Sequence, residues 1–341
     1  MRMPILFLCS VVSILSAVPE PDAKAIDGAI GKSLKLLEKS AAKYSEERSC
    51  FSCHHQALPA MTLSLAQERG FEVDPKAMRE QSEFTQEFFA NRKEAMPKGK
   101  GVPGGSYTTG YALLALSAAG WKPDEITKLM LQHLHKNQEK SGRWRMGTQR
   151  PPLEYSHFTS TVLSLRGLQL FAGQEDSKEI TERVTRARGW LLATKAEETE
   201  DRTWQLLGLK WSGAKENAVA KAAQLLLKEQ RPDGGWGQTG KMKSDAYATG
   251  QALVALRLTG SLSVKDDRWR KGIGWLMRMQ KEDGSWHVKS RSKPFQKYLE
   301  SGYPHGKDQF ISICAGSWST MALLLSRPAA KGQPTVRWAA H

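Results

Sequence analysis

The amino-acid sequence predicts an all-α protein built from repeated pairs of helices. Helical, lysine-rich segments that end at a Gly-Trp turn occur several times, and each is followed by a far more apolar helical segment. A helix with one charged face lies at a surface, whereas a helix that is apolar nearly all round must be enclosed by others. The alternation therefore predicts one outer and one inner helix in each repeat.

The repeated unit is clearest in Lys271–Trp286, which is KGIGWLMRMQKEDGSW. Lys221–Trp236 keeps its Gln, Asp, Gly and Trp at the same spacing. Lys128–Trp144 repeats it more loosely, and Arg188–Leu191 keeps only the front half. Self-similarity of this kind indicates a repeat architecture.

This unit resembles the QW motif of the squalene-hopene cyclase and protein prenyltransferase superfamily. The matching residues are Lys271, Gly272, Trp275, Leu276, Gln280, Gly284 and Trp286. In that family the Gln closes an outer helix and stacks on the Trp of the turn, which ties neighbouring repeats together. The resemblance implies an α/α toroid, a ring of outer and inner helices, in a superfamily whose fold supports several activities.

The first three pairs follow from apolar spacing. Ile26, Ile30, Leu34, Leu37 and Ala41 lie on one face of an outer helix,. Its inner partner, Leu58–Ala66, has a proline in the first turn, where the missing N–H costs nothing,. The second pair is Ser82–Lys93 and Tyr107–Ala119, separated by a loop rich in Gly, Lys and Pro. The third is Ile126–Trp144 and His157–Phe171.

The remaining pairs complete an α6/α6 ring in one domain. Unit four joins Glu179–Lys195 to a helix that begins near Thr203 and Trp204. Unit five joins Glu216–Glu229 to Asp245–Leu258, and unit six joins Trp269–Met279 to Ile313–Leu325 after a long insertion. The starts of the second and fifth inner helices also match, as YTTGYAL at 107–113 and YATGQAL at 247–253.

Both ends of the chain are predicted to lie outside the ring domain, which spans 26–326. Arg2, the apolar run Ile5–Val18 and the small-x-small site at 23–25 are typical of a secretory signal,. We therefore expect an exported protein, periplasmic or extracellular, with residues 1–25 removed; an uncleaved N-terminal anchor is the alternative. Residues 327–341, with Pro and Gly, are expected to form a flexible tail,.

The formal net charge of +15 favours anionic partners, such as an anionic membrane surface or a polyanionic glycan,. Most lysines fall on the predicted outer helices, where a solvated charged face is ordinary. There is no nucleic-acid-binding motif, so nucleic acid is not an expected partner. We expect a monomer.

Six parallel inner helices would bring their N-termini to one mouth, where unpaired N–H groups favour electron-rich ligands. The segment Cys50-Phe-Ser-Cys53-His54 precedes the first inner helix and has the attachment pattern of haem c,. A Cys50–Cys53 disulfide, a zinc site and free thiols are the alternatives. For a haem, His55, His305 or Met61 would be the first candidates for a sixth ligand.

A zinc site has its own rationale. Ring closure places unit six beside unit one, so His305, Asp308 and Cys314 would approach Cys53 and His54. The resemblance to protein prenyltransferases implies an Asp, Cys and His zinc site at the corresponding mouth.

Acid and base candidates also lie near the predicted mouth. Glu300, His305 and Asp308 belong to the insertion within unit six, between Trp286 and Ile313, which is either functional or a solvated lid,. Glu154 and His157 occupy the equivalent place in unit three. Trp204 and Trp318 are expected to face the cavity.

Asp245 is the last of the acid and base candidates. Squalene-hopene cyclases protonate an alkene with the central Asp of an Asp-x-Asp-Asp motif. At the matching point of unit five only Asp245 is kept, so alkene protonation is not expected,.

Three hypotheses about function follow from the sequence. The first is a haem-dependent redox protein with a redox partner. The second is a terpenoid-cyclase-like or lyase-type enzyme acting on a small isoprenoid or glycan. The third is a non-catalytic lipid- or glycan-binding module in which Cys50 and Cys53 form a disulfide.

Overall fold

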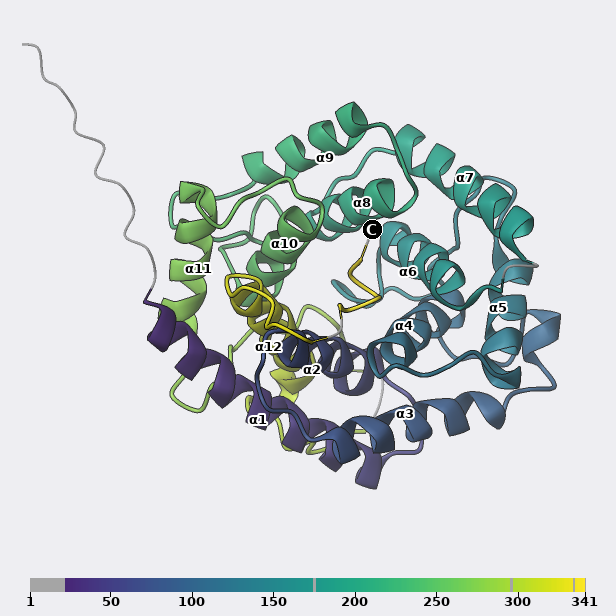
Figure 1. Cartoon of the computed structure of the whole chain (residues 1–341), viewed down its shortest axis with the longest axis horizontal. Coiled ribbons are helices and arrows are strands. Elements are labelled where there is room, and N and C mark those ends of the chain that lie inside the picture. Colours follow the sequence, from purple (N-terminus) through teal and green to yellow (C-terminus); the bar gives the residue numbers. More distant parts are fainter. Residues whose placement is uncertain (1–21, 174–175, 295–296, 334, 341) are drawn as a thin grey trace, which may run out of the picture.

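A computed structural model describes residues 22–173, 176–294, 297–333 and 335–340, which form a ring of helix pairs (Figure 1). The outer helices of these residues are α1 (Ala23–Glu47), α3 (Pro75–Ala90), α5 (Glu125–Asn137), α7 (Ser177–Ala193), α9 (Glu216–Lys228) and α11 (Asp267–Met279). The inner helices are α2 (Leu58–Glu68), α4 (Gly105–Ala118), α6 (His157–Phe171), α8 (Thr199–Trp211), α10 (Ala246–Leu258) and α12 (Gln309–Leu324). The predicted all-α, α6/α6 toroid is confirmed.

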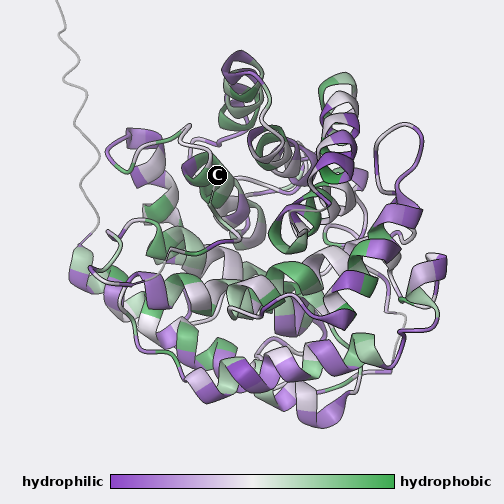
Figure 2. Cartoon of the chain, turned by 45° about the vertical axis from the view of Figure 1, so that its right-hand side comes forward, coloured by the Kyte–Doolittle hydropathy of each residue, from purple (hydrophilic) through white to green (hydrophobic). Residues whose placement is uncertain are grey.

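The two layers differ in burial as the sequence pattern predicts. Nearly every residue of α4, α10 and α12 is buried, whereas α7 and α11 bury only one stripe each. Figure 2 shows this contrast, with polar residues concentrated on the outer helices. Burial of the inner layer is the main source of stability in such a repeat fold, because each pair can cover its apolar face only with its neighbours.

The QW residues act as joints between neighbouring repeats. Gln230 Nε2 donates to the carbonyl oxygen of Arg268 on the next outer helix, at 2.8 Å, and to that of Gly234 in its own turn, at 2.9 Å. Gln138 makes the same two bonds two joints earlier, between α5 and α7. Trp236 Nε1 donates to the Leu226 carbonyl at 2.9 Å, so the turn is fixed to the end of its own helix.

The same joint closes the ring. Gln280 Nε2 donates to the carbonyl oxygen of Ala29 at 2.9 Å, which ties α11 to α1. Gly284 has φ +89°, and a Cβ there would lie 2.8 Å from the backbone of Lys32. Only glycine permits both this conformation and this close approach. In the inner layer, Thr62 Oγ1 of α2 donates to the Ser317 carbonyl of α12.

The inner helices run in the same direction around the ring. Residues in the first turns of neighbouring helices meet: Thr159 of α6 and Tyr247 of α10 both bond to Glu200 of α8. At the opposite end, Gln169 near the end of α6 donates to the Trp211 carbonyl at the end of α8. The N-termini therefore share one side of the ring, the mouth.

Several helix boundaries differ from those predicted. Helix α8 begins at Thr199, four residues before the predicted start, because Glu198 and Asp201 form a capping box there,. Helix α12 begins at Gln309 rather than Ile313. Helix α2 is preceded by a π-helical turn, η1 (Cys53–Ala57), so the first inner helix starts inside the cysteine motif.

The described residues include only the last few residues of the predicted signal peptide, 1–25. Helix α1 begins at Ala23, with Asp22 as its N-cap, so it overlaps the predicted boundary at residue 26. The apolar run Ile5–Val18 lies outside the described residues, and the signal peptide stays a prediction. Within the part of the chain that the structure describes, no helix has the length and apolarity to cross a bilayer.

The segment after α12 packs on the ring, unlike the flexible tail expected from its Pro and Gly content. Trp338 is fully buried, and its Nε1 donates to Ser64 Oγ of α2 at 3.0 Å. Val336 N donates to Glu68 Oε2 at 2.6 Å. Arg166 of α6 donates to the carbonyl oxygens of Arg337, at 2.7 Å, and of Trp338. The segment crosses the middle of the ring at the end opposite the mouth (Figure 1).

Candidate functional site

The cysteine motif lies where α1 passes into the first inner helix. Ser52 caps the π-helical turn by accepting from His55 N at 3.1 Å. This turn directs Cys53 into the interior, where Tyr107 OH donates to its Sγ at 3.2 Å. Burial raises the pKa of the Cys53 thiol to about 12, and the nearby Glu154 carboxylate adds to the effect. Cys53 is therefore held as a neutral thiol.

The two histidines of the motif are enclosed by aromatic rings. His54 and His55 approach each other through their Nδ1 atoms. Tyr44 stacks on His55 with ring centroids 4.8 Å apart, and Phe310 of α12 lies 4.9 Å from His54. Burial lowers the pKa of His54 to about 3, and the positive charge of Arg150 lowers it further. Both imidazoles are consequently neutral at physiological pH.

This packing does not fit a haem. Cys50 and Cys53 are free thiols, so the disulfide alternative is not present in this structure. The donor set of haem c is complete, but the atoms do not share an open face. Cys50 Sγ lies 3.3 Å from Tyr44 OH, whereas Cys53 Sγ meets Tyr107 on another helix. A haem would require Tyr44 and Tyr107 to give up these contacts.

His305 and Asp308 form a separate cluster away from the cysteine motif. His305 Nε2 lies 2.8 Å from Ser285 Oγ, and the His305 ring stacks on His287 at 4.7 Å. His287 Nε2 in turn meets Asp308 Oδ2 at 2.8 Å. His305 has φ +83°, an uncommon conformation for a residue other than glycine,. The turn that precedes η3 (Gly306–Asp308) directs the His305 side chain to Ser285.

The predicted zinc set of Cys53, His54 and His305 is therefore not assembled. Among the described residues, no group of three or more His, Cys, Asp or Glu side chains is arranged to hold a metal ion. Part of the expected proximity is present, because the Phe310 ring of α12 contacts the His54 ring. Ring closure brought α12 to the motif, but not the insertion residues that would supply ligands.

Glu154 and His157 have structural partners. Glu154 forms an ion pair with Arg150, and Thr148 Oγ1 donates to its Oε2 at 3.1 Å. His157 Nδ1 accepts from Met146 N at 2.9 Å, and burial lowers its pKa. An acceptor nitrogen that is occupied by the backbone is not available as a base.

Asp245 is the N-cap of α10. Its Oδ1 accepts from Ala248 N at 3.0 Å, so one oxygen has a structural function,. Burial raises its pKa to about 6, and hydrogen bonds from Ala248 and Gln238 oppose the rise. Asp245 keeps the place expected from the sequence, and there one of its oxygens caps the helix.

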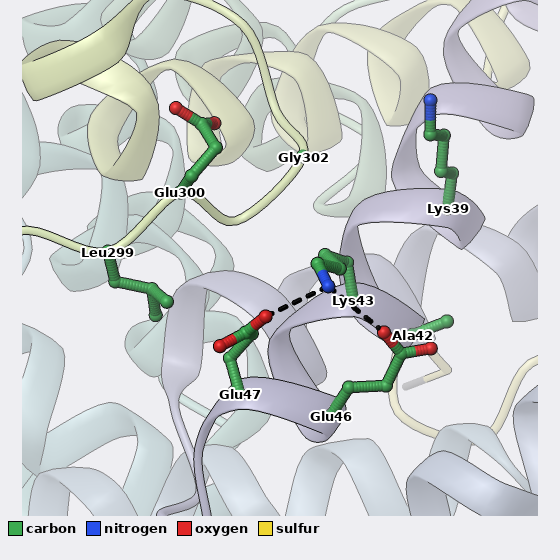
Figure 3. A pocket seen from close by; sticks show the side chains of 8 residues that line it. All are labelled: Lys39, Ala42, Lys43, Glu46, Glu47, Leu299, Glu300 and Gly302. Atoms are coloured by element: carbon green, nitrogen blue, oxygen red, sulfur yellow. Dashed lines mark hydrogen bonds and ion pairs between the residues drawn. The ribbon is translucent and has the colours of Figure 1, made fainter.

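Glu300 faces the outside of the ring. It is exposed, and Tyr298 OH donates to its Oε2 at 2.7 Å. Figure 3 shows it at the edge of a surface pocket of about 530 Å³ between the insertion and α1, lined also by Lys39, Lys43, Glu46 and Glu47. Lys43 is paired with both of these glutamates. This pocket is separate from the interior of the ring.

Glu200, which the sequence analysis did not single out, is the acid inside the mouth. It lies in the first turn of α8 and is fully buried. Its Oε1 accepts from Thr159 Oγ1 at 2.7 Å and from Trp204 Nε1 at 2.9 Å. Its Oε2 accepts from Tyr247 OH at 2.8 Å. Both oxygens of the carboxylate therefore accept hydrogen bonds from neighbouring side chains.

Two opposing effects set the pKa of Glu200. Burial penalises the carboxylate and raises the pKa, whereas the bonds from Thr159, Tyr247 and Gln251 lower it. Burial is the larger effect, and the pKa rises to about 7. Both forms of the group are therefore populated near neutral pH, as acid–base chemistry requires.

Aromatic rings meet beside Glu200 across the axis of the ring. Trp204 of α8 contacts Tyr111 of α4 at 6.2 Å between ring centroids, and Trp318 of α12 at 6.1 Å. In each case one inner helix lies between the two that make contact, so the rings must reach the axis. Trp204 and Trp318 face the centre as expected, and they are fully buried.

A sequence signal for Glu200 did exist. Thr199-Glu200-Asp201 follows Glu198, and an acidic first turn with a capping box marks a helix start,. The apolar pattern begins only at Thr203, which displaced the predicted start by one turn. Glu200 therefore lies just before the helix start that the apolar pattern predicts.

Comparisons with known proteins agree with this geometry. The family model of the squalene-hopene cyclase C-terminal domain matches residues 202–317. Lanosterol synthase erg7A of Aspergillus fumigatus is 32% identical over 108 residues, which cover 31% of this chain and 13% of that protein. The aligned part is thus a small fraction of the lanosterol synthase.

Solved structures extend the likeness to the whole ring. The type II terpene cyclase MstE from Scytonema without ligand has a TM-score of 0.59 at 14% identity, covering 88% of this chain and 98% of that chain. A variant of MstE bound to its substrate geranylgeranyl dihydroxybenzoate has a TM-score of 0.60 at 15% identity, covering 90% and 98%. A protein from Actinoplanes has a TM-score of 0.55 at 16% identity, covering 88% and 99%. The resemblance to the squalene-hopene cyclase and prenyltransferase superfamily is confirmed.

Proposed function

We propose that this protein is an enzyme that moves a proton at Glu200 on an apolar, isoprenoid-like small molecule held at the centre of the ring. One observation carries the proposal: a fully buried carboxyl group with a pKa of about 7 lies among aromatic rings inside the mouth. Carboxyl groups with pKa values moved towards neutrality by burial are typical of catalytic acids and bases.

The surroundings of Glu200 suit an apolar, unsaturated ligand. Tyr111, Trp204 and Trp318 present aromatic rings, which pack on hydrocarbon and whose faces stabilise positive charge,. The similar structure from Scytonema was determined with geranylgeranyl dihydroxybenzoate as its substrate. We infer an isoprenoid-like ligand from this combination.

Glu200 is unsuited to alkene protonation. At the Asp-x-Asp-Asp position, Asp245 is followed by Ala246, Tyr247 and Ala248, so the central acid is replaced by tyrosine. A carboxyl group with a pKa of about 7 is a weak acid, and it would protonate an isolated alkene slowly,. We therefore propose lyase- or isomerase-type proton transfer rather than cyclisation.

Two residues of the insertion, Arg291 and Ser292, lie against the rim of the mouth. Arg291 Nη2 pairs with Glu198 Oε2 at 3.2 Å, and its Nε donates to Gln238 Oε1 at 2.8 Å. Ser292 Oγ donates to the Pro151 carbonyl at 2.9 Å. These contacts hold this part of the insertion against units three, four and five.

The test is hydrogen exchange. The purified protein is incubated in D2O with a set of isoprenoid hydrocarbons, alcohols and ketones, and deuterium in the recovered compounds is measured by mass spectrometry. We expect incorporation into at least one compound, and its loss in Glu200→Gln. Glu216→Gln is the matched control, because it makes the same substitution at an exposed position of an outer helix. Incorporation that is equal in wild type and Glu200→Gln would refute the proposal.

Haem c attachment at Cys50, Cys53 and His54 is a second proposal, and its basis is the sequence motif. Two free thiols beside a histidine support it, and the contacts of Tyr44 and Tyr107 oppose it. No step of the chemistry proposed above passes through a haem. Export, a redox partner and an anionic membrane surface likewise stay predictions.

A further inference from the structure

Four polar atoms at the centre of the ring have no hydrogen-bond partner among the described residues. They are Tyr111 OH, Thr203 Oγ1, Gln251 Oε1 and Trp318 Nε1. All four side chains are fully buried. A buried polar group without a partner costs about 1–3 kcal/mol, and folded proteins contain few of them. The four groups around Glu200 therefore offer hydrogen bonds to a partner that the protein itself does not supply, either an ordered water or a ligand,.

The four unpaired groups lie around Glu200, because the side chains next to them also contact Glu200. The Tyr111 and Trp318 rings both contact Trp204, whose Nε1 donates to Glu200. Gln251 Nε2 donates to Tyr247 OH at 3.3 Å, and Tyr247 OH donates to Glu200. Thr203 lies three residues after Glu200 on α8, so the two side chains share one face of the helix,. The unpaired groups thus come from four inner helices, α4, α8, α10 and α12.

The kinds of atom define the missing partner. An indole N–H can only donate, and a phenol O–H can donate, so Trp318 and Tyr111 call for an acceptor on the ligand. An anionic acceptor would meet the Glu200 carboxylate in a medium of low dielectric constant, which is unfavourable. The acceptor is therefore an uncharged oxygen, attached to a body that packs on aromatic rings.

The chemistry of Glu200 indicates which kind of uncharged oxygen the ligand carries. Glu200 as a carboxylate is too weak a base to take a proton from an ordinary hydrocarbon or from the carbon chain of an alcohol. A proton on a carbon next to a carbonyl group is far more acidic, and carboxylates do remove such protons in enzymes. An uncharged carbonyl oxygen satisfies both the donors and the chemistry.

We propose that the ligand of this site is an apolar carbonyl compound whose oxygen accepts hydrogen bonds from Tyr111 OH and Trp318 Nε1. This inference rests on the proposed function and names its substrate class. Glu200 takes the proton from the carbon next to the carbonyl, and the C–H electron pair forms a C=C bond as the carbonyl π pair moves to oxygen. The two donors stabilise the resulting enolate. Protonated Glu200 then returns its proton to carbon, so no oxidant or reductant is needed.

The test separates recognition from proton transfer. The probes are geranylacetone, an isoprenoid ketone, and its hydrocarbon analogue in which a methylene group replaces the carbonyl oxygen. Binding to the full-length protein is measured by equilibrium dialysis with quantification by gas chromatography. We expect the ketone to bind at least about tenfold more tightly, because the analogue leaves buried donors unpaired. Trp318→Phe and Tyr111→Phe should each remove most of this preference.

A matched control tests whether loss of any indole N–H, at a position away from the site, changes the preference for the ketone. Trp121 Nε1 donates to Asp124 on the outer side of the ring, so Trp121→Phe should keep the preference for the ketone. Circular dichroism shows whether each variant is folded. Conservative removal of one N–H or O–H leaves the aromatic ring in place, which limits damage to the core.

The outcomes distinguish this inference from the proposed function. Equal affinity for the two probes, including no measurable binding of either, overturns the inference. A preference that Trp318→Phe and Tyr111→Phe both retain also overturns it. If the ketone binds selectively but shows no deuterium exchange in wild type, carbonyl recognition stands and proton transfer at Glu200 falls. If exchange occurs without selective binding, proton transfer stands and this inference falls.

Discussion

Gln280 Nε2 lies 2.9 Å from the carbonyl oxygen of Ala29, although the two residues belong to the last and the first outer helix. The same amide also donates to Gly284 in its own turn, at 3.0 Å. One side chain therefore ends α11 and closes the ring. Gln230 makes the equivalent pair of bonds at an internal joint.

Replacement of Gln280 by alanine should destabilise the protein by about 1–3 kcal/mol, because two hydrogen bonds are lost and two carbonyl groups need new partners. Urea denaturation would measure this. Gln230→Ala should cost a similar amount, and Gln224→Ala, an exposed position on α9, should cost little. An unchanged stability of Gln280→Ala would show that the ring does not depend on this joint.

Stability should depend on pH through Glu200. Its pKa is about 7 in the folded protein, compared with an ordinary value of 4.5 for a glutamate side chain, so the folded state binds more protons between these values. The contribution of Glu200 to the free energy of unfolding therefore falls as pH rises from 4.5 to 7, by about 3 kcal/mol.

Glu200→Gln should remove that dependence. We expect the stability difference between variant and wild type to move in favour of the variant by about 3 kcal/mol from pH 4.5 to pH 8. Urea denaturation at several pH values checks it, with Glu216→Gln as the control on the exposed surface. Parallel curves for Glu200→Gln and wild type would mean that the carboxyl group titrates normally.

The C-terminal segment should contribute to stability rather than act as a free tail. Trp338 is fully buried between α2 and α6, so Trp338→Ala should cost about 3–5 kcal/mol,. Lys331→Ala, at an exposed position of the same segment, should have little effect. Limited proteolysis gives an independent readout, because release of the segment in Trp338→Ala would expose it to cleavage. Resistance equal to wild type would argue against the packing described here.

Haem attachment has a visible test. Protein exported by a host with haem-attachment machinery would show a Soret band that shifts on reduction, and Cys53→Ala would abolish it. The packing of Tyr44 and Tyr107 leads us to expect colourless protein. Zinc analysis of the same sample tests the metal alternative. A reducible Soret band would show that the mouth rearranges around a haem, and the closed arrangement would then describe the unloaded protein.

The fold was predictable because its determinants are local. Gln, Gly and Trp at fixed spacing act within one turn, as Gln230, Gly234 and Trp236 show. Gln138 and Gln280 make the same pair of bonds, one in their own turn and one to the next outer helix. The apolar character of the inner helices fixes which layer they occupy. Repetition of one local rule is enough to define a ring.

The site was predicted less well, because burial of a polar residue depends on distant partners. Asp245 and Glu200 are both acids near the start of an inner helix, but only Glu200 meets Thr159, Trp204 and Tyr247. His305 was expected beside His54, and its left-handed backbone directs it to Ser285 instead. Such directions are set by the packing of a loop and leave no periodic signal.

The sequence by itself determined the six helix pairs, the joints between them and the presence of two thiols and a histidine before the first inner helix. Only the tertiary structure decided which acid lies at the centre, that Trp338 closes the far end, and that the thiols point to different partners. The physical reason is the separation along the sequence of the residues that interact. Hydrophobic periodicity and turn chemistry act over a few residues. The pKa of Glu200 instead depends on groups from three helices that meet only when the ring closes,.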